Sequence, residues 1–213
     1  MEQSINLQEL ENMERRKRAT LLNSLAGFRP VILVGTKSLS GNNNLAIFNS
    51  LIHFGADPAL WGIVCRPDAL DRDTYRNIVN NKTYSFSMVP TEMSSMAHQT
   101  SAKYDSDASE FEACGFGVEY AKGFDVPLVK GAIANVILEH VQTLPISLNG
   151  TSIVIGKPVF IRFKNGLVEE DGFANLSGFD VLGCCGLDAY VKSETIARYA
   201  YAKPGVQTTK LER

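Results

Sequence analysis

Short apolar runs bounded by turn-forming residues recur along the chain and predict a protein built mainly from β-strands. Residues 31–34 and 60–65 are apolar stretches of the kind found in buried strands. Residues 84–88 alternate Tyr, Phe and Met with two serines, which predicts a strand with one buried face.

The second half of the chain continues the strand pattern. Residues 132–141 are mostly apolar, and residues 151–163 are rich in β-branched side chains. The dipeptide Asn149-Gly150 lies between these runs and predicts a hairpin turn. Five or more short strands with few helices fit a closed or nearly closed β-barrel better than a doubly wound sheet.

Helical patterns are confined to a few segments. Leucines spaced among charges over residues 7–25 predict an amphipathic helix, so residues 1–27 are interpreted as an N-terminal helical extension and residues 28–213 as one domain. Asp71 is a candidate N-cap for a helix over 72–81, and Thr91 for another helix running toward His98.

Composition bounds the classes of protein that remain. The chain has 213 residues, 45% of them hydrophobic, enough for one substantial core, and its net charge of −2 gives no broad electrostatic reason to expect nucleic acid or an anionic membrane as partner. The basic run at residues 15–18 is interpreted as the solvent-exposed face of an N-terminal helix. Acidic residues within 1–10 do not resemble a signal peptide and no window predicts a membrane span, so we expect a cytoplasmic protein.

Several familiar chemistries lack their sequence signals. The four cysteines form no C-x-x-C pair, and the adjacent Cys184 and Cys185 are poorly placed to bridge each other, so reduced and mostly packed thiols are expected. The three histidines show no metal-ligand spacing, and we expect no metal site. Complete dinucleotide-binding, P-loop and serine-hydrolase motifs are also missing from the sequence.

Polar segments at loop-like positions carry the strongest functional signal. These segments are residues 42–50, Arg66-Pro67, residues 72–74 and residues 98–104. Small and amide residues let backbone N–H groups approach a flat heteroaromatic ring, while Arg, Thr and Lys suit a phosphate. Their order and spacing resemble the flavin reductase-like family of FMN-binding split barrels, over about residues 31–204.

This resemblance implies a fold, a cofactor and an activity. The implied fold is mainly β with helices, an FMN-binding split β-barrel, and the implied assembly is a homodimer with flavin near the subunit boundary. The implied activity is transfer of a hydride from NADH or NADPH to flavin. The alternatives are a flavoprotein that keeps its FMN and reduces another small molecule or a partner protein, and a non-enzymatic flavin-binding module.

The resemblance also implies which residues bind the flavin. Residues 44–46 would line the ring, and the residues at the start of the 72–81 helix would clamp the phosphate, because a helix N-terminus favours an anion. The sequence nominates no catalytic residue. The implied FMN-binding residues are Asn44, Leu45, Ala46, Ser50, Arg66, Arg72, Thr74, His98, Thr100, Ser101, Lys103 and Tyr190.

Ordinary structural explanations also account for several of these positions. Residues 44–46 fit an edge strand after a Gly-Asn loop, and Arg72 with Thr74 fits a solvated first helical turn. Arg66 fits a surface ion pair. Tyr190 fits either stacking or gating at the flavin ring, or simple packing.

Three further positions have two explanations each. Lys103 stands where the family commonly carries an acidic residue, and a cation there suits either the FMN phosphate or the balancing of Asp105 and Asp107. His98 is a flavin contact or a polar residue at a helix end. Ser50 is a flavin contact or a cap on the local backbone.

Overall fold

The computed structural model describes residues 2–67 and 72–211. Two helices, α1 (Leu7–Asn12) and α2 (Arg15–Leu25), open the chain, and neither contains a buried residue. The prediction of one continuous helix was wrong. Met13 is extended, and the Glu14 carboxylate accepts the amides of Arg16 and Lys17, each at 2.9 Å, which starts a second helix.

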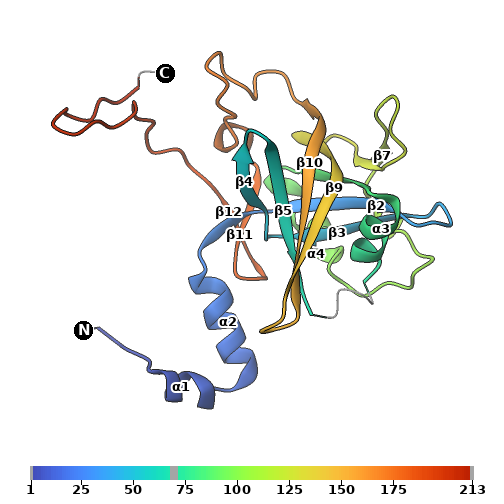
Figure 1. Cartoon of the computed structure of the whole chain (residues 1–213), viewed down its shortest axis with the longest axis horizontal. Coiled ribbons are helices and arrows are strands. Elements are labelled where there is room, and N and C mark those ends of the chain that lie inside the picture. Colours follow the sequence, from blue (N-terminus) through green and yellow to red (C-terminus); the bar gives the residue numbers. More distant parts are fainter. Residues whose placement is uncertain (1, 68–71, 212–213) are drawn as a thin grey trace.

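A seven-stranded antiparallel sheet forms the body of the protein (Figure 1). The two longest strands lie side by side within it, and β3 and β4 are its edges. In spatial order the strands are β3 (Asn43–Phe48), β2 (Ile32–Lys37), β6 (Thr83–Met88), β9 (Ala134–Ile146), β10 (Thr151–Phe163), β5 (Ala59–Cys65) and β4 (Ile52–Ala56).

Shorter elements surround this sheet. One three-stranded sheet joins sequence-distant segments, β1 (Phe28–Pro30), β11 (Leu182–Cys185) and β12 (Ala189–Lys192), and β7 (Val118–Glu119) pairs with β8 (Leu128–Val129). The helical elements of the body are α3 (Asp73–Asn81), η2 (Thr91–Met93), α4 (Ser94–Gln99), α5 (Glu110–Ala113) and η3 (Ser177–Phe179). None of the helices described here combines the length and apolar character needed to span a membrane.

Several predicted boundaries agree with the structure. β10 covers residues 151–163 as predicted, and Gly150 closes the hairpin with a left-handed φ of 71°. The helix predicted over 72–81 is α3, although the proposed cap Asp71 lies outside the described residues. The Thr91 cap was wrong, because Thr91 begins η2 itself and no side chain caps that turn.

The prediction of one buried face for β6 was also wrong, because both faces are covered. Ser85 and Ser87 have no exposed surface. The Ser85 hydroxyl donates to the Pro127 carbonyl at 2.6 Å, and the Ser87 hydroxyl donates to Asn135 Oδ1 at 2.6 Å. Their partners lie more than 40 positions away in sequence, so the local alternation could not reveal that these hydroxyls are satisfied inside the core.

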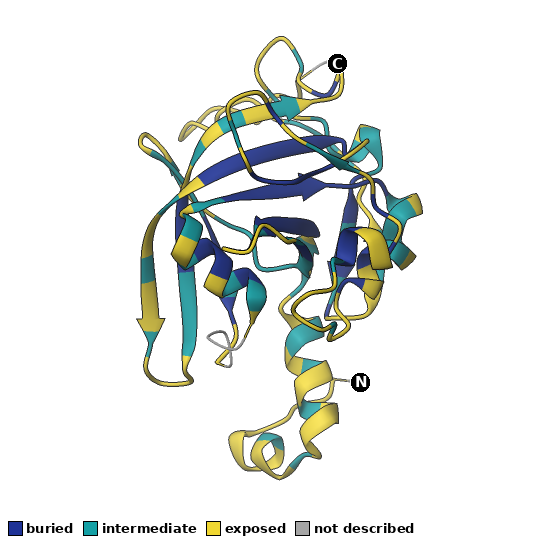
Figure 2. Cartoon of the chain, turned by 90° about the vertical axis from the view of Figure 1, so that its right-hand side faces the viewer, coloured by how far each residue is buried: buried dark blue, intermediate teal, exposed yellow. Residues whose placement is uncertain are grey.

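The core lies on both faces of β2. Ile32 and Val34 belong to one buried cluster, whereas Val31 and Leu33 belong to another, and all four are fully buried. Figure 2 shows this arrangement as buried strands inside the body, with α1 and α2 projecting from it without any buried segment. The main sheet is therefore closely packed on both faces of β2, and this packing supports the edge strand β3, which pairs with β2.

Candidate functional site

The ring-lining and phosphate-binding segments predicted from the sequence meet between β3 and α3. The side-chain amide of Asn44 donates to the hydroxyl of Thr74 at 3.1 Å and to that of Thr36 at 3.2 Å. Asn77 of α3 donates to the same Thr36 hydroxyl at 3.1 Å. All four side chains are buried. This network fixes the N-terminal half of α3 against β3.

The first turn of α3 has features that suit an anion. Thr74 acts as the acceptor in its bond with Asn44, so its hydroxyl hydrogen can still point to another acceptor. Arg72 occupies the N-cap position with its side chain exposed, and no side chain caps the helix there. Asp73, the neighbouring acid, forms an ion pair with Arg76.

A buried carboxylate that sequence reasoning missed lies at the outer edge of β3. Glu110 Oε2 accepts the backbone N–H of Leu45 at 2.9 Å, and Glu110 is only 9% exposed. Burial raises the pKa of Glu110 above its ordinary value, Asp73 raises it further, and bonds from the Leu45 and Glu110 amides oppose the shift. In the sequence, nothing near Glu110 indicates a partner on β3.

A second meeting point joins α4 to β12. His98 Nδ1 lies 2.9 Å from the Tyr190 hydroxyl, and the two rings meet edge to face with centroids 5.7 Å apart. Tyr190 also packs on the buried cluster that contains Leu45 and Ala97. Burial is the main cause that raises the pKa of Tyr190. This pair therefore adjoins the cluster beneath β3.

Two predicted hydroxyls serve the local backbone. The Ser50 hydroxyl donates to the Val64 carbonyl at 3.2 Å and accepts the Val64 amide at 3.1 Å, which ties the segment after β3 to β5. Thr100 is buried, and its hydroxyl donates to the Ala97 carbonyl at 2.8 Å at the end of α4. Both geometries match the capping explanation for such residues.

The remaining predicted positions are distributed around these contacts. Ala46 lies in β3 and is half-buried. Arg66 is exposed directly after β5, and Ser101 and Lys103 are exposed in the loop after α4. The structure thus joins Asn44 to Thr74 and His98 to Tyr190 through their side chains. Ser101 adjoins the second pair through its backbone N–H, which donates to the His98 carbonyl at 2.9 Å.

A polar hollow of about 320 Å³ opens beside the Asn44 network. Amide, hydroxyl and charged side chains of the β2–β3 loop and α3 form most of its wall, including Asn43, Asn44, Asp73 and Asn77. Such a lining suits the polar part of a ligand better than a flat aromatic ring. Within the described ranges, no cluster of three or more His, Cys, Asp or Glu side chains is arranged to hold a metal ion.

Comparison with known proteins places this geometry in a family context. Residues 28–177 match the flavin reductase-like domain. A protein of Shewanella frigidimarina NCIMB 400, assigned as a flavin reductase with a split barrel domain, is 38% identical, with a TM-score of 0.91 over 94% of this chain and 100% of that chain. The predicted fold, a mainly β split barrel with helices, is confirmed.

Two more distant structures share the fold. The 2-nitrobenzoate 2-nitroreductase NbaA of Pseudomonas fluorescens is 21% identical, with a TM-score of 0.80 over 96% of this chain and 98% of that chain. An FMN-binding protein of Thermus thermophilus, solved with bound 1-cyclohex-2-enone, is 20% identical, with a TM-score of 0.70 over 82% of this chain and 93% of that chain.

Proposed function

Because the chain belongs to the flavin reductase-like family, we propose that it binds FMN and uses it to transfer a hydride from NADH or NADPH to flavin. The observation that carries this proposal is the 3.1 Å bond between Asn44 and Thr74. It joins the strand proposed to line the ring to the helix proposed to hold the phosphate. FMN, once bound, supplies the two-electron chemistry.

The residues at the start of α3 fit the phosphate of FMN. Arg72 supplies an exposed cation, Thr74 supplies a hydroxyl hydrogen, and the first backbone N–H groups of the helix supply further donors. Charge-assisted bonds of this kind are the strong ones in phosphate recognition. In this proposal Arg72 and Thr74 anchor the cofactor and take no part in the redox step.

The outer edge of β3 fits the isoalloxazine ring of FMN, except that one of its backbone amides is already hydrogen-bonded. Leu45 lies opposite Gly35 of β2, yet its N–H bonds to Glu110, so this amide is directed away from β2 and is already engaged. Along an antiparallel edge strand, successive backbone N–H groups point alternately toward the neighbouring strand and away from it. Ala46 therefore directs its N–H toward β2, and Ile47 is the next residue whose N–H points outward. Leu45 is fully buried and would therefore shape the strand from inside, whereas half-buried Ala46 would contact the ring and Ile47 is the better candidate for a donor.

A spectrum of the freshly purified protein tests the proposal. We expect bound or readily bound FMN, giving a yellow protein, and bleaching on anaerobic addition of NADH or NADPH. Retained colour without bleaching would favour a non-enzymatic flavin-binding module or a different electron donor. A protein with no affinity for flavin would refute the proposal.

A second candidate is a flavoprotein that keeps its FMN and reduces another small molecule. The structural likeness to a nitroreductase favours it, and so does the His98–Tyr190 pair, in which His98 is exposed and Tyr190 is half-buried. Imidazole and phenol groups of this kind can donate a proton to a substrate that is being reduced. Oxidation of the bleached protein by a nitroaromatic compound, faster than by free FMN, would distinguish this activity from flavin reduction.

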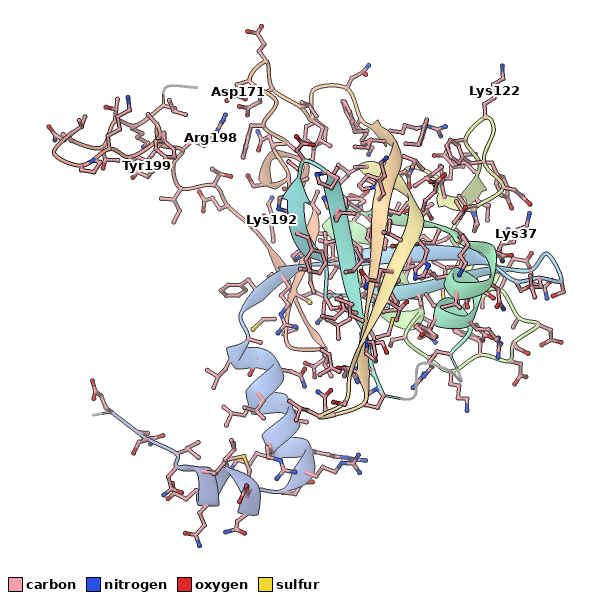
Figure 3. All side chains as sticks on the ribbon, in the orientation of Figure 1. Lys37, Lys122, Asp171, Lys192, Arg198 and Tyr199 are labelled. Atoms are coloured by element: carbon pink, nitrogen blue, oxygen red, sulfur yellow. The ribbon has the colours of Figure 1, made fainter. Side chains whose placement is uncertain are left out.

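We further propose that the protein works as a homodimer in the cytoplasm. Apolar side chains on the two terminal segments support a dimer, because Leu25 is 74% exposed and Ile196 and Tyr201 are 90% and 92% exposed. The C-terminal segment is nevertheless fixed at its base, where Arg198 pairs with Asp171 (Figure 3) and with Glu169. The guanidinium carbon of Arg198 also lies 4.0 Å from the centroid of the Phe173 ring.

All four cysteines are free thiols, as predicted, which suits a reducing compartment.

A further inference from the structure

The backbone N–H of Leu45 faces outward at the edge of the main sheet, and its hydrogen bond to the buried Glu110 carboxylate is unusual for such a position. β3 pairs only with β2 inside that sheet, so every second amide of β3 faces outward. An outward amide commonly meets water, but Leu45 is fully buried and its N–H meets a carboxylate at 2.9 Å. The backbone N–H and the side chain of Leu45 are thus both enclosed.

Keeping a carboxylate at this position is costly. Glu110 is almost completely buried, and desolvation together with the nearby Asp73 disfavours its ionised form. α5 is held in place by Phe111, which is fully buried in the same cluster as Leu45. Anchoring by Phe111 holds α5, and with it the backbone of Glu110, against β3.

Two independent contacts therefore converge on consecutive residues of β3. Thr36 and Thr74 hold the side chain of Asn44, and Glu110 holds the main chain of Leu45. The first contact comes from β2 and α3, and the second from α5, so the segment is fixed from two sides. A segment fixed in this way is suited to present a rigid surface to a flat ligand.

We infer that Glu110 is a positioning residue for the flavin ring, acting through the backbone of residues 44–46. The inference rests on the proposed function. In this role Glu110 sets the backbone conformation of the strand against which the ring lies. The property of Glu110 that matters here is its hydrogen-bond acceptor more than its negative charge. Glu112, on the same short helix but exposed, offers a matched control.

The experiment compares E110Q, E110A and E110D with E112A in the full-length protein. The readouts are amide hydrogen exchange at Leu45, the affinities for FMN and riboflavin, and the visible circular dichroism of the bound flavin. We expect E110A to lose protection at Leu45, to bind both flavins roughly tenfold or more weakly and to alter the dichroism, because the buried Leu45 N–H is left without an acceptor. E110Q retains an acceptor and should stay within about threefold of wild type.

The controls separate this role from general damage to the fold. E112A should match wild type in all three readouts. E110D keeps the charge but withdraws it by one methylene, so it should resemble E110A; it also serves if E110A does not fold. Unchanged flavin affinity and dichroism in both E110A and E110D would overturn the inference, and so would equal losses in E110Q and E110A, since the charge would then be the active property.

The inference and the proposed function fail in different ways. If the wild-type protein binds neither FMN nor riboflavin, the proposed function is wrong and Glu110 positions nothing for a flavin, whatever its effect on exchange at Leu45. If the wild-type protein binds flavin and bleaches with NADH or NADPH while the Glu110 variants bind it normally, only the inference about Glu110 is wrong.

Discussion

The Tyr190 hydroxyl meets His98 Nδ1 at 2.9 Å across 92 positions of sequence, which fastens β12 to α4. A bond between partly exposed side chains should contribute about 0.5–1.5 kcal/mol to folding. We predict a coupling free energy in this range when Y190F, H98A and the double variant are compared by urea unfolding. A coupling indistinguishable from zero would mean that the pair does not persist in solution.

Replacing Arg72 with alanine should weaken FMN binding by the ~1.5–3 kcal/mol of a lost charge-assisted hydrogen bond. Riboflavin, which has no phosphate, should bind almost unchanged. Titration of both flavins against both proteins measures the difference. Equal losses for the two ligands would show that Arg72 supports the fold or the ring instead of the phosphate, and Lys122→Ala, altering an exposed cation in the loop between β7 and β8, is the control.

Gly156 should tolerate no side chain, because Tyr84 fills the space beside it. A Cβ at this position would come within 2.9 Å of Tyr84 Cζ and 3.1 Å of the Glu139 carbonyl, and it would overlap the Tyr84 hydroxyl. We predict that G156A lowers the free energy of unfolding by about 1–3 kcal/mol. The Tyr84 hydroxyl is buried without a hydrogen-bond partner among the described residues, so Y84F should be neutral or stabilising by about 1 kcal/mol and should partly rescue G156A in urea unfolding.

Glu110 should make folding pH-dependent in a defined direction. Since its pKa is raised in the folded state, the folded protein binds the proton more tightly than the unfolded chain, and stability falls as pH rises from the ordinary value near 4.5 through the folded value. E110Q lacks this contribution. The free energy of unfolding of wild type relative to E110Q should therefore decrease over this window and then level off. A difference that is constant with pH would contradict the buried, perturbed carboxylate.

The terminal segments should control assembly if the protein is a homodimer. Leu25→Ser and Tyr201→Ser replace exposed apolar side chains, so they should change the free energy of unfolding of one subunit by no more than about 0.5 kcal/mol. Both should weaken the dimer in light scattering at micromolar concentration. Leu148→Ser, at a 96% exposed position in the β9–β10 turn, is the control. A wild-type monomer that binds FMN tightly would contradict the proposed assembly.

Sequence patterns predicted the main sheet well where the signal is local. The β9–β10 hairpin follows from two β-rich runs around Asn149-Gly150, and the helix expected over 72–81 after the candidate cap Asp71 is α3. The patterns failed where distant segments decide the outcome. β6 looked half-exposed because the partners of Ser85 and Ser87 lie far along the chain, and the pairing of β1 with β11 joins residues more than 150 positions apart, as in Phe28 with Cys185.

In the candidate site, too, local segments could be predicted from the sequence, whereas contacts between distant segments could not. Family-like segments identified Asn44 and Thr74, and the structure brings them into contact. Glu110 could not be selected from sequence, because its importance comes from a single backbone amide on an edge strand 65 residues earlier. An acidic residue at the start of a short helix ordinarily faces water, but here Glu110 is buried beside Phe111 and bonds to Leu45.

The carboxylate on the edge of β3 also bears on how the protein avoids aggregation. An exposed strand edge can recruit a strand from another chain, which is a route to amyloid-like pairing. Glu110 already occupies the amide of Leu45, and α5 covers this part of the edge, so an incoming strand would have to displace both and leave a buried charge unpaired. Partial unfolding of α5 would uncover this edge and release the Leu45 amide, so the helix protects the edge against pairing with another chain.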